Sequence, residues 1–574
     1  MGLRSGDRIV RLILPTLVLR GVVASSPNNT GVSYAKDILD AVIIPNANDI
    51  RGSIALPTAL DLAPDAVITW HSSNPNVVSD KSSGKKAAGV VKRPPVGSNP
   101  LSVTLTCCVT GRYDHACRDF HITVQPAVKL AKLSRYAMVN FARSNSQEGQ
   151  QIYMAYSVGN DATNWIAVND GHIYINSKKG MHAVRDPSIV RSPDSDKFYM
   201  VATDLNVDGF AYGWQGWNWA QSAASRYIEV WESHDLRHWS PQRHVLVAPE
   251  EAGMVYAPEA IWDPEIAAYV VYWTSSIYSS GTHFTNDTSD PLGRYPLTRN
   301  EIMYSTTRDF ISFTPAQIMS GRSNHGTLDA VIIPDKEAGY YHRIMCDRIS
   351  TGVNLTKYVP CGGEDVYQER ARSILAPADE WELVTGCITH NAMNTTYAEG
   401  PLVIKANPGD IRGLGYYMYA DQKWVASPSG QAMEEQYSPY WSVSLDDPKW
   451  TAINWTRKPK YDLALGVIRH GHIEALTTAE HAALRRANLS SIIIKSLPTK
   501  LKYKLGENLN QAGLEVSATY TDGVTDEDIS EGYGGYTLEG YDPWHIGRQD
   551  MILCYSVLKV KRCVVFQVEV IKTD

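Results

Sequence analysis

The sequence has no excess of positive charge and no long apolar run in its interior. Among its 574 residues, 54 are Lys or Arg and 61 are Asp or Glu, so the formal net charge is −7. The cationic surface that a nucleic acid requires is therefore not expected. Beyond the N-terminal segment, no stretch approaches the roughly 20 apolar residues of a membrane span. We expect neither a nucleic acid nor a membrane as a partner.

Phenylalanine is also scarce, with 8 Phe against 32 Tyr and 15 Trp. Tyr and Trp combine an apolar body with a polar group, which suits β-sheet surfaces and walls that stack on sugars. With 44% hydrophobic and 20% charged residues, the composition is that of a folded protein rather than a disordered one. One hydrophobic core stops growing near roughly 250–300 residues, so the length predicts two to four domains.

Residues 1–24 have the features of a secretory signal peptide. Arg4, Arg8 and Arg11 precede a short apolar run, and Val22-Val23-Ala24 offers small residues for cleavage. Sequons for N-glycosylation begin at Asn28, Asn286, Asn354, Asn394, Asn454 and Asn488. Together these features predict a secreted, extracellular glycoprotein.

The 8 Cys residues form local clusters and no Cys-x-x-Cys metal motif. The clusters are Cys107, Cys108 and Cys117; Cys346, Cys361 and Cys387; and Cys554 and Cys563. Outside the cell these residues are expected to form disulfides, whose connectivity the sequence leaves open. Cys554 and Cys563 flank a predicted hairpin and are placed to pair across it.

Both ends of the chain are predicted to be small β-sandwiches. In 36–126 and again in 491–574, short β-rich runs alternate with clusters of Gly, Asn, Ser and Pro. Ile68-Thr-Trp-His-Ser-Ser-Asn-Pro and Gly513-Leu-Glu-Val-Ser-Ala-Thr-Tyr resemble bacterial-type immunoglobulin-like domains. Such domains are spacers in most cases. A helix is predicted at 478–488, just before the second of them.

The region between them, 130–488, repeats with a period of about 70 residues. A turn followed by an aromatic residue recurs in five copies, which end at Trp165, Trp239, Phe313, Trp381 and Trp450. Strands without matching helices at this period predict a propeller. The fold class is therefore all-β: a five-bladed β-propeller between two immunoglobulin-like sandwiches.

A second series of five segments runs in phase with these turns, and each segment carries an ionisable residue before an apolar strand. The five residues are Asp186, Glu259, Asp329, Glu399 and His470. Because equivalent positions of propeller blades lie at one height around the axis, we expect these side chains to ring one end of the central channel. Converging carboxylates raise the pKa of at least one member, which suits general acid and general base catalysis of glycosidic cleavage. Single Asp-Pro or Glu-Gly-Pro motifs are common turn openings, and a metal site is an alternative use of such a ring.

The middle region resembles glycoside hydrolase family 43, whose members are five-bladed, inverting propellers. The resemblance rests on Val184-Arg-Asp-Pro-Ser-Ile-Val, Tyr256-Ala-Pro-Glu-Ala-Ile-Trp, Thr327-Leu-Asp-Ala-Val-Ile-Ile, Ala398-Glu-Gly-Pro and Arg469-His-Gly. It implies that Asp186 is the general base, Glu399 the general acid, and Asp329 the residue that orients Glu399 and raises its pKa. It also implies that His470 lies beside a hydrated structural ion, often Ca²⁺, while the chemistry itself requires no cofactor. The chain departs from the family pattern at Tyr256, where Trp is common, and at His472, where Ser or Thr is common.

Four further residues are predicted to contact substrate: Asp204, Trp217, Glu259 and Arg343. Asp204 follows the second strand of its blade, and Trp217 lies with Trp214 and Trp219 in an aromatic loop of the same blade. Such a loop suits stacking on sugar. For Arg343, on the strand after Asp329, a surface ion pair is the alternative interpretation.

The segment from Val184 to Ser240 resembles a subgroup of exo-acting furanosidases. We therefore expect a monomeric enzyme that removes terminal α-L-arabinofuranose from a plant polysaccharide or oligosaccharide. β-D-Galactofuranosidase is the close alternative, since the two sugars differ by one exocyclic carbon, worth only about 1–3 kcal/mol of discrimination. β-Xylosidase is less favoured, and the retaining sucrose and fructan hydrolases need Asn-Asp-Pro-Asn and Glu-Cys motifs that the chain lacks. A non-catalytic, sugar-binding propeller is the alternative from another functional class.

Overall fold

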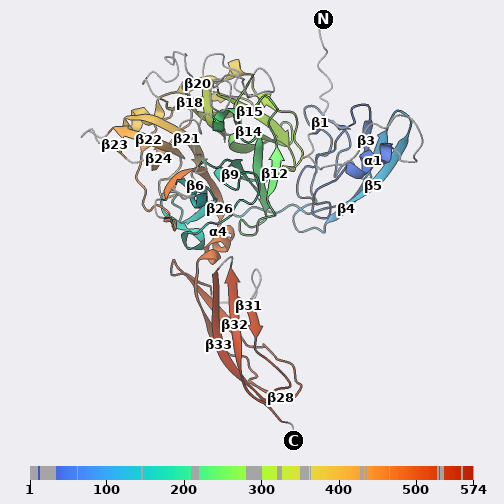
Figure 1. The fold of residues 1–574 in the computed structure, drawn as a ribbon, viewed down its shortest axis with the longest axis vertical. Coiled ribbons are helices and arrows are strands. Elements are labelled where there is room, and N and C mark those ends of the chain that lie inside the picture. Colours follow the sequence, from blue (N-terminus) through green and yellow to red (C-terminus); the bar gives the residue numbers. More distant parts are fainter. Residues whose placement is uncertain are drawn as a thin grey trace.

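Five antiparallel sheets surround a common axis in the computed structural model of the protein, with one smaller β domain beside them and another below them in Figure 1. The structure describes residues 11–12, 34–60, 63–143, 147–207, 219–278, 300–319, 326–348, 361, 364–426, 432–433, 436–463, 466–526, 529, 536–557 and 560–572. The predicted fold class, a five-bladed propeller between two immunoglobulin-like domains, is confirmed. The signal-peptide prediction falls almost wholly outside the described residues.

Each blade is one sheet whose first strand lies nearest the axis. Blade 1 joins strands from both ends of the propeller: β26 (Val467–Thr477), β6 (Leu133–Arg143), β7 (Tyr153–Ser157) and β8 (Trp165–Ala167). Blade 2 contains β9 (Val184–Arg191), β10 (Phe198–Asp204), β11 (Tyr227–Ser233) and β12 (Arg243–Leu246). Blade 3 contains β13 (Tyr256–Asp263), β14 (Ala268–Ser276), β15 (Asn300–Thr307) and β16 (Gln317–Ile318). Pairing of β26 with β6 closes the ring, because it ties the last strand of the propeller to the first.

Blade 4 contains β17 (Gly326–Asp335), β18 (Tyr340–Arg348), β19 (Val366–Ala371) and β20 (Glu382–Thr385). Blade 5 contains β21 (Thr395–Lys405), β22 (Tyr416–Ala426), β24 (Gln436–Ser442) and β25 (Thr451–Ala452), with β23 (Ala432–Met433) paired to β22. Two helices of the propeller are α3 (Ile388–Met393) and α4 (Thr478–Arg485), residues 219–222 are also helical, and 3₁₀ turns lie at Gln147–Gly149, Val168–Gly171, Ala378–Glu380 and Arg486–Asn488. The helix predicted at 478–488 is thus confirmed as α4 and the turn after it.

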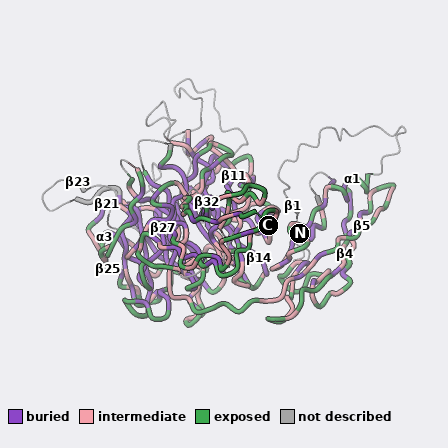
Figure 2. Tube along the Cα trace, turned by 90° about the horizontal axis from the view of Figure 1, so that it is seen from below, coloured by how far each residue is buried: buried purple, intermediate pink, exposed green. Residues whose placement is uncertain are grey.

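The core lies between the blades, because their second strands are covered on both faces. Every residue of β10 and of β14 is buried, and Figure 2 shows buried positions concentrated in the body of the propeller. Some buried Tyr side chains have bonded hydroxyl groups: Tyr136 and Tyr417 both donate to Asp410, at 2.6 and 2.8 Å. The Tyr excess therefore serves sheet packing in which the polar end of a buried ring can still find a partner.

The recurring turn that revealed the repeat is held by an aspartate. Asp235 Oδ1 accepts hydrogen bonds from the backbone N–H groups of Arg237 and His238, at 2.9 and 2.7 Å. Asp309 Oδ1 makes the same contacts to Ile311 and Ser312 one blade later. An Asp side chain that bonds to the backbone two residues ahead is a common way to fix a turn.

The N-terminal domain contains α1 (Tyr34–Ala41) and a sheet of β3 (Val67–Ser72), β4 (Leu101–Thr110) and β5 (His115–Val124). The short β1 (Arg11–Leu12) and β2 (Ala59–Leu60) pair in parallel. Sequence patterns did not predict α1, which buries Ala35, Ile38 and Leu39 against the sheet. Hydrogen bonds from Arg93 to both carboxylate oxygens of Asp196 attach this domain to blade 2.

The C-terminal domain is a sandwich of two sheets. One contains β27 (Leu489–Ser496), β29 (Glu515–Tyr520) and β30 (Thr525–Asp526), and the other β28 (Lys502–Lys504), β33 (Val560–Ile571), β32 (Gly547–Val557) and β31 (Tyr536–Glu539). One hydrophobic cluster continues from blade 1 through α4 into this domain (Figure 1). Asn488 lies at the junction, 1% exposed, and donates to Ala167 O at 2.6 Å. A glycan cannot occupy Asn488 in this fold, whereas Asn394 and Asn454 are exposed.

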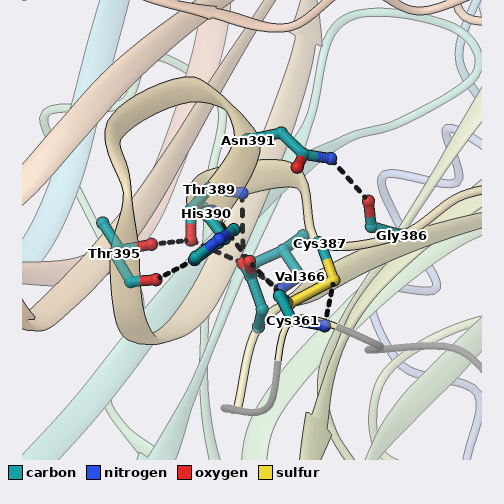
Figure 3. The surroundings of a disulfide bond; sticks show 9 residues. Cys361, Val366, Gly386, Cys387, Thr389, His390, Asn391 and Thr395 are labelled. Atoms are coloured by element: carbon teal, nitrogen blue, oxygen red, sulfur yellow. Dashed lines mark hydrogen bonds between the residues drawn. A yellow bond between two sulfur atoms is a disulfide. The ribbon is translucent and has the colours of Figure 1, made fainter. Parts of the chain in front are cut away.

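Six cysteines form three disulfides: Cys108–Cys117, Cys361–Cys387 and Cys554–Cys563. The pairing predicted across the last hairpin is confirmed. Cys361–Cys387 fixes the N-terminus of α3 beside Asp365, which accepts hydrogen bonds from Thr389 and His390 (Figure 3). In the described part of the chain, no helix is long and apolar enough to span a membrane.

Candidate active site

The inner strands of the blades share an irregularity at one end of the channel. Four of them have a residue with positive φ where the register shifts: Asp186 (48°), Ala257 (45°), Asp329 (53°) and Gly400 (59°). In β26 the register shifts between Ile468 and Gly471, around His470. A β-bulge redirects a side chain and is frequent near active sites. The bulges therefore redirect a side chain of each inner strand, and they do so at equivalent positions of the blades.

This geometry corrects the prediction that the five ionisable residues lie at one height. Asp186, Asp329 and His470 occupy the bulges, whereas Glu399 precedes the bulge at Gly400 and Glu259 lies two residues beyond the bulge at Ala257. The sequence motifs align by their apolar strands and do not show where the extra residue of a bulge is inserted. Hence one tier holds Asp186, Asp329, Glu399 and His470, and Glu259 belongs to a deeper tier.

Asp186 is held in its ionised form. Its Oδ1 lies 3.5 Å from His470 Nδ1, and its Oδ2 accepts a hydrogen bond from Thr203 Oγ1 at 3.1 Å. Burial alone would raise the pKa of Asp186, but His470, Arg185 and Thr203 together hold it below its usual value. A buried carboxylate that stays ionised at neutral pH is suited to accept a proton from water.

Asp329 has the opposite character. Burial, together with the negative charges of Glu399 and Asp186, raises the pKa of Asp329 to about 7, against the attraction of His470. Its Oδ2 accepts a hydrogen bond from the backbone N–H of Gly400 at 3.0 Å, next to Glu399. Asp329 therefore fixes the backbone that carries Glu399.

Gly400 is required at this point for two reasons. Its φ of 59° is unfavourable for residues with a side chain, and an added Cβ would lie 2.8 Å from both Cβ and Cγ of His470. The backbone of the Glu-Gly-Pro motif therefore packs directly against the imidazole. This contact and the bond to Asp329 place Glu399 beside His470.

Glu399 is bound by Arg469, whose Nη2 lies 3.0 Å from Glu399 Oε1. Arg469 Nε also donates to Asp421 Oδ2 at 2.8 Å, and the same Oδ2 accepts the backbone N–H of His470 at 3.1 Å. Asp421 lies on β22 directly opposite Glu399 in the register. The positive charge of Arg469 is thus divided between two carboxylates.

His470 is the cation at the centre of this tier. Burial alone would lower the pKa of His470, but Asp186, Asp329 and Asp421 raise it to about 9. In the residues that the structure describes, no group of three His, Cys, Asp or Glu ligand atoms within 4.8 Å of one another includes His470. The side chains present therefore supply a poor site for a directly coordinated ion, and the hydrated ion beside His470 stays a prediction.

Glu259, predicted to contact substrate, lies in the deeper tier and is 4% exposed. Its Oε2 accepts a hydrogen bond from Ser188 Oγ at 2.6 Å and lies 3.6 Å from His472 Nδ1. Ser188 and His472 each follow a residue of the upper tier by two positions, so they face the channel one level below Asp186 and His470. Glu259, Ser188 and His472 thus fill the channel beneath the candidate catalytic groups.

Asp204 is buried beneath a loop at the end of its blade. Its Oδ1 accepts the backbone N–H of Met181 at 2.7 Å, and the carboxylate lies in a cluster with Glu229 and His244. Thr203, the residue before it, reaches Asp186, and adjacent strand residues point to opposite faces. Asp204 therefore supports the loop that leads into β9 and does not face Asp186.

Arg343 does not contact substrate in this fold, contrary to the prediction. It is 1% exposed and paired with Glu369, which accepts from its Nε at 2.8 Å, and its guanidinium lies 4.1 Å from the ring centre of Trp381. Arg343 pairs with Ile332 on β17, three residues beyond Asp329 and away from the bulge. Sequence order placed it on the correct strand but gave no indication of its height or face. The predicted stacking residue Trp217, with Trp214, lies outside the described residues.

Asp421 and Arg469 contact the candidate catalytic groups, although the sequence analysis assigned a role to neither of them. A signal was present, because Thr203, Thr274, Cys346 and Asp421 occupy the same position on the second strand of four successive blades. Each contacts the bulge of the next blade: Thr203 bonds Ala257 N, Thr274 bonds Asp329 N, the Cys346 thiol lies 3.0 Å from Ala398 O, and Asp421 bonds His470 N. Asp421 is the charged member of this series, and unlike the other three it also binds Arg469.

Comparison with known proteins agrees with this geometry. Residues 132–482 match the family model of a glycosyl hydrolase family 43-related group, described as "Probable glycosyl hydrolase domain". Residues 33–127 match "Atrophied bacterial Ig domain", and residues 496–570 match "Bacterial Ig-like domain (group 3)". An alpha-L-arabinofuranosidase of Bifidobacterium longum is 28% identical over 448 residues, which are 71% of this chain and 40% of that protein. The chain thus spans well under half the length of this relative.

Solved structures with a similar propeller are more distant in sequence. A thermostable family-43 glycoside hydrolase is 17% identical, with 48% of this chain and 73% of that chain covered and a TM-score of 0.31. The alpha-L-arabinofuranosidase from Lactobacillus brevis is 13% identical, with 47% and 71% covered and a TM-score of 0.29. The family model covers more than half of the chain, in the region that carries the acidic tier. The chain therefore belongs to the glycoside hydrolase family 43-related group, with its glycoside hydrolase domain between two bacterial immunoglobulin-like domains.

Proposed function

We propose that the protein is a secreted, inverting exo-glycosidase that releases terminal α-L-arabinofuranosyl residues from plant cell-wall polysaccharides of the arabinan or arabinogalactan type. The observation that carries this proposal is the tier of Asp186, Asp329 and Glu399 around His470. Acid–base cleavage of a glycosidic bond requires two carboxyl groups, one of them ionised, and Asp186 is held ionised while Glu399 lies in the same tier beside Asp329. The name of the Bifidobacterium longum relative supports the choice of sugar.

Asp186 acts as the general base. Its ionised carboxylate takes a proton from a water molecule, and the oxygen of that water attacks the anomeric carbon of the arabinofuranosyl residue. Thr203 and His470 hold the carboxylate in place through its two oxygens. Attack from the face opposite the leaving group yields a sugar of inverted configuration.

Glu399 acts as the general acid. It donates its proton to the glycosidic oxygen as the bond to the anomeric carbon breaks, so the remainder of the polysaccharide leaves as an alcohol. Asp329 positions Glu399 through the N–H of Gly400, and repulsion between the two carboxyl groups disfavours the state in which both are ionised. Arg469 fixes the orientation of the Glu399 carboxyl. The proton that Asp186 gains and the proton that Glu399 loses balance over one turnover.

A parallel assay with three p-nitrophenyl glycosides tests the proposed substrate. We expect the full chain to hydrolyse the α-L-arabinofuranoside with a kcat/KM at least tenfold above that for the β-D-galactofuranoside or the β-D-xylopyranoside. A higher value for the galactofuranoside would overturn the choice of sugar and leave the catalytic groups unaffected. Failure to hydrolyse any of the three would contradict the proposed exo-glycosidase activity.

Three further parts of the proposal concern the setting of this site. Export is supported by the three disulfides, since an oxidising compartment is where such bonds persist. A structural calcium ion near His470 and a monomeric state remain predictions from sequence. The steps above use side chains and water alone.

A further inference from the structure

A pocket lies away from the acidic tier, between the N-terminal domain and blades 2 and 3. Asn46, Arg51 and Ser53 line it from the N-terminal domain, and Ser192, Trp262 and Asp309 line it from the propeller. Ser192 follows the last residue of β9, whereas Asp186 lies near the first, and Trp262 lies near the end of β13. The pocket therefore opens at the end of the propeller opposite the bulges.

The walls of this pocket are held together by contacts between the two domains. Arg308, in the turn after β15, donates hydrogen bonds to the carbonyl oxygens of Ile54 and Ala87 at 2.9 and 3.0 Å. Arg51 donates to Asp196 Oδ2 at 2.8 Å. Because these bonds bridge the domains on two sides, the pocket is a preformed feature of the fold.

One wall of the pocket is aromatic. Trp262 contacts Tyr269 edge-on with ring centres 5.1 Å apart, and Tyr199 stacks on Phe310 at 4.2 Å. Trp262 is half-buried and lines the pocket, whereas Phe310 is fully buried behind it. A partly open indole ring supported from behind by other rings is suited to stack on the apolar face of a sugar.

Polar side chains line the pocket beside its aromatic wall, and only some of them are open to it. Within the described residues, Ser192 Oγ and Asp309 Oδ2 are buried and have no hydrogen-bond partner, and Ser192 is 6% exposed. Asp309 uses its other oxygen to hold the turn at Ile311 and Ser312. A buried polar atom without a partner costs about 1–3 kcal/mol. Both atoms are closed off from solvent, so the polar side chains open to a ligand are those of Asn46 and Ser53, which are at least partly exposed and line the pocket.

The charges around the pocket favour a neutral ligand. Arg51 is paired with Asp49 and Asp196, and Lys197 is paired with Glu232 at 3.1 Å. The guanidinium of Arg308 is occupied by backbone carbonyl oxygens. These pairings leave the cationic groups engaged by protein atoms, so a uronic acid or a phosphate gains little here.

We propose that this pocket is a non-catalytic carbohydrate-binding site that holds a neutral sugar residue of the polysaccharide on which the propeller acts. The identity of that polysaccharide rests on the function proposed above, whereas the pocket itself does not. Binding at the far end of the propeller tethers a long or branched chain while the acidic tier works on another of its ends. The N-terminal domain then has a direct function, because it supplies half of the site.

Affinity electrophoresis of the full chain in gels that contain soluble arabinan tests the proposal. The Glu399→Gln background prevents hydrolysis during the run, and two pocket variants are compared in it. Trp262→Ala removes the stacking ring. Gly52→Leu obstructs the pocket from the N-terminal domain, where an added Cβ meets no atom within 4 Å, so the fold should tolerate it. Trp544→Ala is the matched control, because Trp544 is 72% exposed on the C-terminal domain.

We expect both pocket variants to raise the dissociation constant for arabinan at least fivefold and Trp544→Ala to leave it unchanged. In the otherwise native chain, the pocket variants should hydrolyse p-nitrophenyl α-L-arabinofuranoside with unchanged kcat and KM. Migration of Gly52→Leu identical to that of its parent would overturn the proposal, as would loss of binding in Trp544→Ala. Hydrolysis of the nitrophenyl substrate reports on the proposed function separately, so failure of the pocket and failure of that function are distinguishable.

Discussion

Glu399 and Asp421, which face each other on adjacent strands of blade 5, share one guanidinium. Arg469 reaches Glu399 Oε1 with Nη2 at 3.0 Å and Asp421 Oδ2 with Nε at 2.8 Å. An arginine that faced Glu399 alone would favour its ionised form and oppose its role as a proton donor. Under the proposed mechanism, Asp421 draws part of the positive charge of Arg469 away from Glu399, so that Arg469 orients the proposed general acid without favouring loss of its proton.

Replacement of Asp421 by Asn should impair catalysis more than substrate binding. The positive charge of Arg469 would then act on Glu399 alone, so the alkaline limb of the kcat–pH profile should move to lower pH. We expect kcat at neutral pH to fall about 10- to 100-fold, within the range of general acid catalysis, with KM changed less than threefold. Stopped assays between pH 4 and 9 measure both quantities.

Asp410→Asn is the control for this variant, because Asp410 is also a buried aspartate of the propeller but bonds Tyr136 and Tyr417. It should lower thermal stability and leave the alkaline limb in place. An identical pH profile for Asp421→Asn and the parent chain would show that Asp421 has no influence on the general acid.

The sequence predicted the fold well because the propeller repeats its hydrophobic pattern and its Asp turns with a period of about 70 residues. It predicted Asp186, Asp329 and Glu399 as neighbours for the same reason. The height of Glu259 depends on a bulge at Ala257, which adds a residue that no hydrophobic pattern reveals. Asp421 reaches the backbone of His470 because of how neighbouring strands pair and pack, which the sequence does not show. Arg343 lies on a strand that is covered on both faces, so its position on that strand did not reveal that it would be buried against Glu369.

Gly400→Ala should inactivate the enzyme with a smaller effect on its overall stability. The new Cβ would lie 2.8 Å from two atoms of His470, so either the imidazole or the backbone of Glu399 must move. We expect kcat/KM to fall at least 100-fold, since a shift of about 1 Å in a catalytic group can cost that much. Steady-state kinetics and the melting temperature are the two measurements.

Gly413→Ala separates the close contact from backbone strain. Gly413 also has a positive φ, 86°, but an added Cβ there meets no atom within 4 Å. This control should show the cost of strain alone, about 1–2 kcal/mol, and nearly full activity. Equal activity of the two glycine variants would contradict the proposed contact between Gly400 and His470.

Asp329→Asn should change how stability depends on pH. In the folded chain the pKa of Asp329 is raised to about 7, above the value of an exposed aspartate, because of burial and its acidic neighbours. Its contribution to stability is therefore fully present below the unfolded pKa near 4 and is lost as the pH rises through about 7. The asparagine variant does not ionise, so its melting temperature relative to the parent should increase between pH 5 and pH 8.

Differential scanning calorimetry of both proteins across this pH range measures the difference. The expected gain in unfolding free energy of the variant between the two pH values is about 1–3 kcal/mol, since one pKa unit corresponds to about 1.4 kcal/mol. A difference that stays constant with pH would show that Asp329 does not titrate in this window.

The disulfide Cys361–Cys387 should stabilise the blade that carries α3. It closes a loop of 26 residues, for which chain entropy predicts a contribution of about 3 kcal/mol. The double variant Cys361→Ser/Cys387→Ser should therefore unfold at a lower urea concentration than the parent. Replacement of Cys554 and Cys563 by Ser is the control at a separation of 9 residues, with a smaller expected loss; the opposite order would contradict this estimate.

The most direct test of the account compares the variant Glu399→Gln on two substrates that differ only in their leaving group. Nitrophenol leaves without help from an acid, whereas the sugar alcohol of an arabino-oligosaccharide requires protonation. The ratio of kcat/KM for p-nitrophenyl α-L-arabinofuranoside to that for α-1,5-linked arabinotriose should therefore rise at least 100-fold in Glu399→Gln relative to the parent chain. An unchanged ratio, with both substrates affected equally or not at all, would contradict the assignment of Glu399 as the general acid.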